Sequence, residues 1–352
     1  HCEIMFILEV DTVGQYLVDQ DIIASVSDVQ VRQLLGGVSN RVLLVVFSGD
    51  RKPWVLKQAR EQLAVEQPWF CSVTRVLREM DVLQISNRML AGKTNVLPCQ
   101  SVVPEILFED RENYVYAMTA MQGNAREWKQ DLLAGELDAE IFKSVGWLLG
   151  IMHGGSWEDS EIAEQVGDQV FFEELRVDPY YRQIARVHPA LQPAIDSLVS
   201  DLSDHRRCLV HGDFSPKNML VEDADVTRLM LLDFEVGHFG DPAFDLGFFL
   251  THIVIKSIRD PSLAVQYAKM AQVFIAEYQR VMLPRVGAAV VGEIESRGCT
   301  NLGACLVARV DGKSPVEYLS DSEQRETVRQ LGKRLLLGDV QRVENIWDIE
   351  TV

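Results

Sequence analysis

The sequence predicts an α+β protein of two lobes, in which a small lobe with a five-stranded antiparallel sheet and one helix precedes a larger, mostly helical lobe. Three observations support this fold class. Residues 29–121 contain short runs of β-forming residues bounded by turn residues, whereas the chain after residue 122 has mainly helical periodicity. Residues 208–246 carry two apolar runs that each end in an acidic motif. A length of 352 residues is sufficient for two such lobes.

The first lobe is expected over residues 29–121, after an N-terminal helical extension over residues 1–28. Within that extension, residues 11–24 have the apolar spacing of a short helix. The runs VQVRQLL, RVLLVVF and WVLKQ predict three strands, separated by the turns GGVSN and GDRKP, because glycine and proline favour turn geometry. A helix over residues 72–90 and two further strands, VVPEILFED and NYVYAMTAM, complete the lobe.

Residues 122–352 are expected to form the second lobe, which would carry the catalytic and substrate-binding residues. Helical spacing or composition extends over residues 138–153, 190–203, 261–284, 287–307 and 321–337. Short strands at 208–211, 219–222 and 229–232 interrupt these helices and carry the acidic motifs. Since no low-complexity linker separates the lobes, we expect a hinge near residue 121.

The composition, 47% hydrophobic and 24% charged, is typical of a folded soluble protein. A net charge of −18 argues against a surface for nucleic acid or an anionic membrane, and no stretch approaches the roughly 20 apolar residues of a membrane span. The N-terminal HCEIMFILEV carries two glutamates and no basic leader, so it does not indicate a signal peptide. Six scattered cysteines without a Cys-x-x-Cys pair favour reduced thiols in a cytoplasmic protein. Nothing in the sequence indicates an oligomeric state.

The strongest chemical signal is the series H-G-D-x5-N followed by D-x-E, each behind an apolar run. This layout is typical of a phosphoryl-transfer centre, and it predicts Asp213 as the catalytic residue that orients a substrate hydroxyl and accepts its proton. Asn218 and Asp233 offer the hard oxygen ligands that Mg²⁺ prefers. Glu235 lies on the same side of an extended backbone as Asp233, so it is expected either to be a further ligand or to orient a metal-bound water.

Two neighbours of these motifs are expected to be structural. His211 would hold the motif turn through hydrogen bonds, and Asp245 would open the helix DLGFFLTHIVI and accept backbone donors from the turn around His211.

In the small lobe, Lys57 ends an apolar strand and Glu79 lies on the following helix. A strand lysine that binds the α- and β-phosphates of a nucleotide, held in place by a helix glutamate, is the arrangement that a kinase requires. Glu66 is a weaker candidate partner, because Pro68 breaks the segment between it and the helix.

Two backbone segments are further candidates for nucleotide binding. The turn between the first two predicted strands contains Gly36, Gly37, Ser39 and Asn40. Glycines there would let the backbone approach phosphates without a Cβ in the way, although ordinary hairpin turns use the same residues. The end of the fifth predicted strand, Thr119 to Met121, is where backbone groups could bind the edge of an adenine ring.

The residues now assembled resemble those of the aminoglycoside phosphotransferase and choline kinase superfamily, which shares a two-lobed fold with the protein kinases. The resemblance extends over nearly the whole chain from about residue 29, in GGVSN, VLKQA, REMDVL, VHGDFSPKNML and LLDFEVGHFGDPAFDLG. It implies a small-molecule kinase that uses ATP and Mg²⁺, and it agrees with the roles predicted above.

Within that superfamily the chain looks most similar to 5-methylthioribose kinase. It shares a Trp69 and an Arg75 after KQA, and it has D-x-E in place of D-x-G at residues 233–235. The late segment GACLVARVDGKSPVEYLSD resembles the helix that carries a substrate-binding arginine pair in that enzyme, although here only Arg309 of the pair is present. The resemblance implies that Arg309 and Asp311 contact substrate; the alternative is a solvated helix end.

Several alternatives remain open at this point. A protein kinase is disfavoured, because the 12 residues from Asp233 to Asp245 leave no room for an activation segment. A pseudokinase is disfavoured because the base, the metal ligands and the lysine are all present. Arg309 favours a neutral or anionic sugar such as methylthioribose as the substrate, whereas an aminoglycoside or an amino alcohol, such as a choline- or homoserine-like compound, is the alternative. The choice between ATP and GTP is not predicted.

Overall fold

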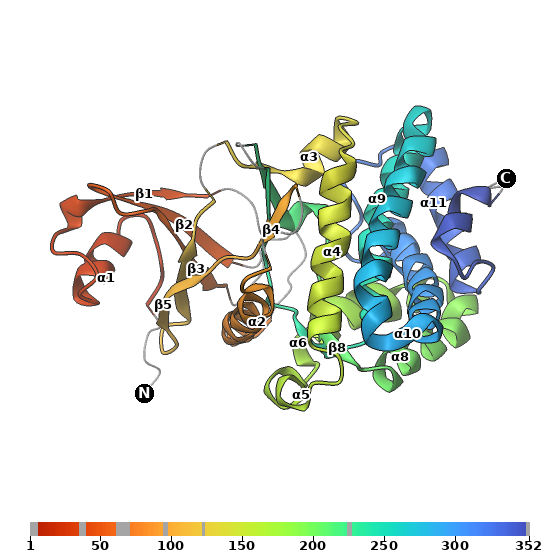
Figure 1. Ribbon diagram of the computed structural model, residues 1–352, viewed down its shortest axis with the longest axis horizontal. Coiled ribbons are helices and arrows are strands. Elements are labelled where there is room, and N and C mark those ends of the chain that lie inside the picture. Colours follow the sequence, from red (N-terminus) through yellow and green to blue (C-terminus); the bar gives the residue numbers. More distant parts are fainter. Residues whose placement is uncertain are drawn as a thin grey trace.

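A computed structural model describes residues 6–34, 40–60, 71–93, 98–121, 124–223 and 227–349. The chain forms a sheet-containing lobe at its N-terminal side and a larger helical lobe at its C-terminal side (Figure 1). This arrangement confirms the predicted fold class.

The small lobe contains one five-stranded sheet in which all neighbouring strands are antiparallel. In spatial order its strands are β1 (Val29–Gln33), β2 (Asn40–Phe47), β3 (Trp54–Ala59), β6 (Val115–Thr119) and β5 (Ile106–Asp110). All six residues of the central strand β3 are buried, which explains its nearly continuous apolar sequence.

Two helices cover the two faces of this sheet, and the alternation along β3 decides which side chains meet which helix. Leu56 faces the side covered by α1 (Val13–Asp19), where it belongs to a core with Leu17. Val55 faces the opposite side, where α2 (Arg75–Leu90) packs. Lys57, two residues after Val55, therefore points toward α2, so its ammonium group can reach a carboxylate on that helix.

The segment VVPEILFED does not form the single strand that the sequence predicted. It splits into β4 (Gln100–Val102) and β5, with Pro104 between them. Proline has no N–H to donate to a strand ladder, so it interrupts the pairing. β4 instead pairs in parallel with β10 (Arg228–Leu231), in a four-stranded sheet that also contains β9 (Met219–Glu222) and β7 (Arg126–Glu127). Strands from both sides of residue 121 thus share one sheet, and a lobe boundary at that residue stays a prediction.

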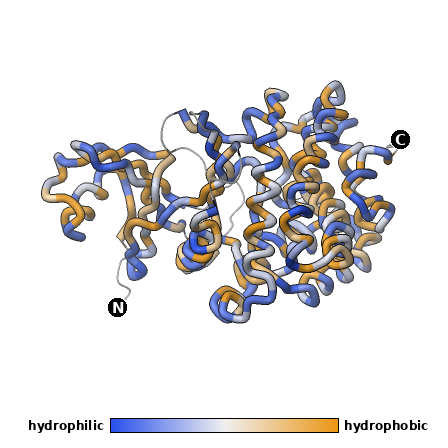
Figure 2. Tube along the Cα trace, viewed as in Figure 1, coloured by the Kyte–Doolittle hydropathy of each residue, from blue (hydrophilic) through white to orange (hydrophobic). Residues whose placement is uncertain are grey.

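The large lobe is built mainly from α4 (Ala139–Gly155), α9 (Pro242–Arg259), α10 (Ala264–Asp311) and α11 (Ser322–Leu336), which lie side by side in Figure 1. Figure 2 shows many hydrophobic residues along these helices, and α9 is buried nearly all round, as expected for a helix that packs against several others. The two helices predicted over 261–284 and 287–307 are confirmed: they share the label α10, but the backbone of Gly287 between them is not helical, with φ 80° and ψ 164°. Pro284 precedes this glycine by one turn and lacks the N–H that a helix requires.

Shorter elements connect these helices and complete the lobe. The α-helices are α3 (Trp128–Leu133), α5 (Ser160–Val166), α6 (Val170–Phe172), α7 (Gln183–Val187) and α8 (Gln192–Asp204). A π-helix, η2, spans Glu173–Arg182, and a two-stranded sheet pairs β8 (Cys208–Val210) with β11 (His238–Gly240). The 3₁₀ turns are η1 (Val26–Asp28), η3 (Pro189–Leu191), η4 (Pro216–Asn218), η5 (Pro261–Leu263) and η6 (Val343–Asp348).

Two features of the described residues bear on the class of protein. None of their helices combines the length and the apolar character that crossing a membrane requires. The five cysteines from Cys71 onward are buried as free thiols.

Candidate active site

Lys57 joins the two lobes through a pair of buried ion pairs. Its Nζ lies 2.6 Å from Oε1 of Glu79 on α2 and 2.6 Å from Oδ1 of Asp233, which follows β10. Burial by itself lowers the pKa of Lys57, but the charges of Asp233 and Glu79 raise it well above its usual value, so the ammonium stays charged. The backbone of Asp233 has φ 69°, a left-handed conformation that is uncommon outside glycine and that recurs at functional sites.

Glu79 lies in a strongly charged environment. Burial raises its pKa to about 7, with Lys57 opposing the shift and with Asp233 and Glu235 adding to it. Lys57 therefore stabilises the ionised form of Glu79 inside the protein.

Asp213 lies in the loop after β8, and its carboxylate is held by three side chains. Oδ1 forms an ion pair with Nη2 of Arg176 at 2.8 Å, and Oδ2 contacts Nζ of Lys217 at 3.0 Å and accepts from Nδ2 of Asn218 at 2.7 Å. Burial by itself raises the pKa of Asp213, but Arg176 and Lys217 lower it well below its usual range. Asp213 is therefore a fixed, ionised carboxylate at neutral pH.

The loop that carries Asp213 is braced by Asp245, as the sequence suggested. Oδ2 of Asp245 accepts from the backbone N–H of His211 at 2.7 Å, and Oδ1 accepts from that of Gly212 at 2.9 Å. Asp245 does not open its helix, however: α9 begins at Pro242, and Asp241 is its N-cap. Proline at the first helical position after an aspartate cap is the usual helix start, so the helix begins one turn earlier than predicted.

Glu235 makes contacts that the sequence did not predict. Its Oε2 accepts from Nε of Arg75 at 3.1 Å and from Nδ2 of Asn40 at 3.0 Å. Arg75 is completely buried, four residues before Glu79 on the same face of α2. Asn40 therefore reaches from the start of β2 to the acidic motif of the other lobe.

The oxygen groups at the centre fit a magnesium ion. One ligand atom each of Glu79, Asp233 and Glu235 lies within 4.8 Å of the others. Because Nδ2 of Asn218 donates to Asp213, the carbonyl oxygen of that amide is the atom left for a metal. Carboxylate and amide oxygens suit Mg²⁺. Lys57 binds one oxygen of Glu79 and one oxygen of Asp233, so each of these carboxylates keeps a second oxygen for a metal. That Asn218, Asp233 and Glu235 are the metal ligands stays a prediction.

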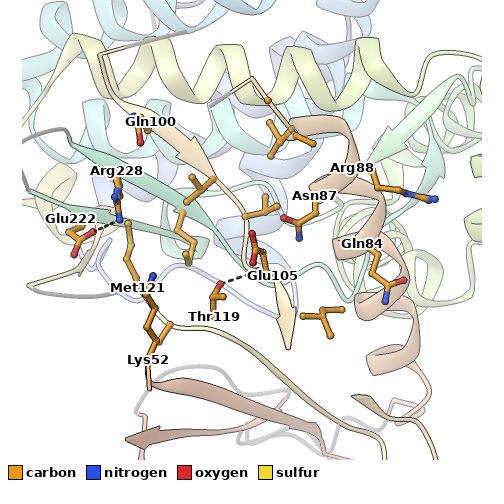
Figure 3. A pocket seen from close by; sticks show the side chains of 18 of the residues that line it. Lys52, Gln84, Asn87, Arg88, Gln100, Glu105, Thr119, Met121, Glu222 and Arg228 are labelled. Carbon is orange, nitrogen blue, oxygen red and sulfur yellow. Dashed lines mark hydrogen bonds and ion pairs between the residues drawn. The ribbon is translucent and has the colours of Figure 1, made fainter. Parts of the chain in front are cut away.

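The nucleotide-binding candidates are only partly described. Gly36, Gly37 and Ser39 lie outside the described residues. Thr119 and Met121 line a cavity of about 1270 Å³ that extends along β4, β5 and the end of α2 (Figure 3). The backbone N–H of Thr119 donates to the backbone oxygen of Glu105, and the hydroxyl of Thr119 accepts from the backbone N–H of Glu105. The backbone N–H of Thr119 is therefore already paired within the strands. None of the described residues that line this cavity belongs to the charged centre.

Arg309 and Asp311 do not share one surface. Nη1 of Arg309 donates to the hydroxyl of Tyr180 at 3.1 Å and to the backbone oxygen of Ser314 at 2.7 Å. Asp311 lies about 200° around the helix axis, where it forms ion pairs with other elements. Its carboxylate is 2.6 Å from Nε of Arg329 and 2.7 Å from Nε2 of His188. In this structure Asp311 joins α10 to α11 through its ion pair with Arg329, and its contact with substrate stays a prediction.

Arg176 is the residue of this site that sequence reasoning missed most completely. It lies in the π-helix and also donates from Nε to the backbone oxygen of Gly212 at 2.7 Å, so it holds both the loop and the carboxylate of Asp213. No local motif marks it. Lys217, by contrast, lies four residues after Asp213 inside the motif, and its spacing could have indicated the ion pair.

Comparisons with known proteins agree with this arrangement. A family model described as "Phosphotransferase enzyme family" matches residues 30–284. The chain is 23% identical over 326 residues to a protein named 4-hydroxytryptamine kinase from Psilocybe cyanescens, covering 85% of each. Among solved structures, it resembles a choline kinase from Cryptosporidium parvum (TM-score 0.57, 12% identity, 93% of this chain and 95% of that chain). It also resembles an ethanolamine kinase from Plasmodium vivax (TM-score 0.55, 12% identity, 97% of this chain and 94% of that chain).

Proposed function

The chain belongs to the phosphotransferase enzyme family and is a small-molecule kinase with a hydroxyl acceptor, and we propose that it transfers the γ-phosphate of ATP, with Mg²⁺, to a small polar metabolite. Membership of this family confirms the superfamily resemblance seen in the sequence. The observation that carries the proposal is the pair of buried ion pairs from Lys57 to Glu79 and Asp233, next to a fixed Asp213.

In this proposal the residues of the two lobes have different roles. Lys57, held by Glu79, binds the phosphates of the nucleotide. Asp233 and Asn218 hold Mg²⁺, which supplies charge neutralisation on the phosphates when it is bound. Asp213 orients the acceptor hydroxyl and receives its proton.

The low pKa of Asp213 shapes its role. A carboxylate with a pKa far below its usual range is a weak base, so Asp213 acts chiefly by holding the hydroxyl in line, and the proton reaches it late. Lys217, whose side chain is 44% exposed, is near enough to stabilise negative charge as the phosphoryl group moves.

This account predicts a pH effect for Arg176→Met. Arg176 holds the pKa of Asp213 down, so its removal raises that pKa by about 1 to 3 units. Because kcat needs the ionised carboxylate, the acidic limb of the pH profile of kcat should move upward by the same amount. The variant should therefore lose activity most strongly at the acidic end of the profile.

Two further variants make this measurement specific. Arg176→Lys keeps a cation and should restore most of the wild-type profile. Arg182→Met removes an exposed arginine of the same π-helix, paired with Glu173, and should leave the profile unchanged. An acidic limb that stays in place in Arg176→Met would contradict the role of Arg176.

The acceptor is a separate part of the proposal. The sequence favours a sugar such as methylthioribose, on the basis of Arg309 and the resemblance described above. The named relatives instead favour an amine that carries a hydroxyl, such as an amino alcohol, which is therefore the second candidate.

A screen for ADP release tests both parts. The purified chain, with MgATP, should be offered methylthioribose, other sugars, amino alcohols, homoserine and aminoglycosides. We expect turnover with a sugar. Turnover of only amino alcohols or kanamycin-type compounds would contradict the proposal that the acceptor is a sugar. Nucleotide binding without turnover of any acceptor would favour a pseudokinase.

A further inference from the structure

Three basic side chains gather beyond the catalytic loop, on the two long helices of the large lobe. His252 and Lys256 are one turn apart on α9, so they lie on the same face. Arg309, near the end of α10, is close enough that its charge lowers the pKa of both, although burial is the largest cause in each case. We refer to His252, Lys256 and Arg309 as the basic cluster.

The basic cluster is one aromatic ring away from the base. The guanidinium of Arg176, which binds Asp213, lies 5.8 Å from the centre of the Tyr180 ring. The guanidinium of Arg309 lies 6.0 Å from the same ring and donates to its hydroxyl. Tyr180 therefore connects Arg176, which binds Asp213, to Arg309 of the basic cluster.

Neither Lys256 nor Arg309 forms an ion pair with a carboxylate among the described residues, and burial holds the pKa of His252 well below its usual value. Lys256 is 1% exposed, and its Nζ donates only to the backbone oxygen of His252 at 3.2 Å and to the hydroxyl of Tyr318 at 3.5 Å. Arg309 donates only to Tyr180 and Ser314. Nε of Arg309 and Nε2 of His252 are buried without a hydrogen-bond partner in this part of the chain.

Nearby carboxylates offset only part of this positive charge: Glu317 and Glu127 raise the pKa of Lys256, but burial, Lys129 and Arg309 outweigh them. Glu317 is largely exposed and pairs with Lys129. Lys129 itself lies over the ring of Tyr318, as Lys256 does, so it adds positive charge on that side. Glu127 is partly buried, and burial raises its pKa, which makes its charge less available.

A buried cation without a partner is unfavourable, and here the effect is visible on Lys256. Burial, with Lys129 and Arg309 adding to it, lowers the pKa of Lys256 to about 7. Unpaired hydrogen-bond donors and neighbouring like charges destabilise the protein when no acceptor is bound. A bound anion would accept hydrogen bonds from these donors and neutralise their charge. An ammonium group would add a further like charge.

We propose that the acceptor carries, besides its hydroxyl, an anionic group, a carboxylate or a phosphate ester, that binds Arg309 and Lys256. The proposal rests on the proposed kinase function, and it replaces the neutral sugar favoured there with hydroxy acids and phosphorylated sugars. His252, one turn from Lys256, donates a hydrogen bond to the same group from Nε2, which has no partner among the described residues.

Matched pairs of acceptors test the proposal directly. Glycerol and glycerate, ribose and ribose 5-phosphate, and ethanolamine and serine differ mainly in the anionic group, and the first two pairs separate carboxylate from phosphate. With MgATP and the full chain, we expect kcat/KM to be about 10- to 100-fold higher for the anionic member of at least one pair. Equal or higher kcat/KM for the neutral or amine member of every pair that reacts would overturn the proposal.

Lys256→Met and its control identify the residue. In the variant, KM for the anionic acceptor should rise about 10- to 100-fold with little change in kcat or in KM for ATP. The ligand-free variant should also melt a few degrees higher than the wild type, because a buried unpaired cation is replaced by an apolar side chain of similar shape. Lys269→Met, an exposed lysine on α10, should change neither property. Arg309→Lys keeps the charge and should give a smaller rise in KM than Lys256→Met.

Anion binding can be measured without any turnover, which separates this proposal from the kinase function. With MgADP present, inorganic phosphate or acetate should raise the melting temperature of the wild type and of Lys269→Met, but not that of Lys256→Met. If the chain were not a kinase, this difference would persist while no ADP was released. If instead the cluster did not bind anions, ADP would be released with a neutral or amine acceptor and the anions would shift all three proteins equally.

Discussion

Asp213→Asn is expected to lower kcat about 10²- to 10⁴-fold. The amide has nearly the same size as the carboxylate, but it cannot receive the proton of the acceptor hydroxyl. It also leaves Arg176 and Lys217, now bound to the carboxylate at 2.8 and 3.0 Å, without a counter-charge. The rate of ADP release at saturating acceptor measures the effect. KM for ATP should change little, because Lys57 and Glu79 are untouched.

The control for this variant is Asp196→Asn. Asp196 is an exposed residue of α8 whose carboxylate accepts from the side chain of Gln192, so its substitution should leave ADP release at the wild-type rate. Circular dichroism and thermal melting of both variants separate loss of chemistry from loss of fold. Wild-type turnover in Asp213→Asn would refute the proposed mechanism.

Lys57→Met is expected to have the second large effect, on nucleotide binding and on stability together. Without the ammonium, Glu79 and Asp233 are left as neighbouring carboxylates in a buried site. Removal of one partner from a buried ion pair lowers the free energy of unfolding by about 3 to 5 kcal/mol. Loss of a charge that binds the phosphates lowers kcat/KM for ATP by about 10²- to 10³-fold.

A double variant shows whether the unpaired carboxylate causes the loss of stability. Adding Glu79→Gln to Lys57→Met removes the carboxylate that Lys57 neutralises, so urea unfolding should show that part of the stability returns while activity does not. Lys143→Met, on the surface of α4 with only a 3.9 Å contact to Glu140, serves as the control and should change the free energy of unfolding by less than about 0.5 kcal/mol. A double variant no more stable than Lys57→Met would contradict this explanation.

The sequence anticipated much of the fold because its signals are local. Alternating β-forming runs, turn residues and helical periods depend on a few neighbouring residues, and they correctly predicted the five-stranded sheet and most long helices. The strand predicted over VVPEILFED is the exception, because Pro104 divides it into β4 and β5. The proline is a local signal for the break, but the new partner of β4 is not local: β4 pairs with β10, which lies more than a hundred residues later in the chain.

The candidate centre was accessible from sequence for the same reason. Asp213 and Asn218 lie in one loop, Asp233 follows the next strand pair, and Lys57 points to the face of the sheet that α2 covers. These positions follow from strand alternation and short spacings, so the sequence by itself predicted which groups would lie together at the candidate site.

Only the tertiary structure decided what surrounds those groups. Arg176, in a π-helix that no motif marks, forms an ion pair with Asp213. Arg75 forms an ion pair with Glu235, and Asp311 forms one with Arg329. A long charged side chain can reach several possible ion-pair partners. Which of them it binds depends on how distant helices pack, because the residues next to it in the sequence do not decide it. For the same reason the unpaired Lys256, on which the proposed acceptor class depends, was invisible until α9 and α10 were seen side by side.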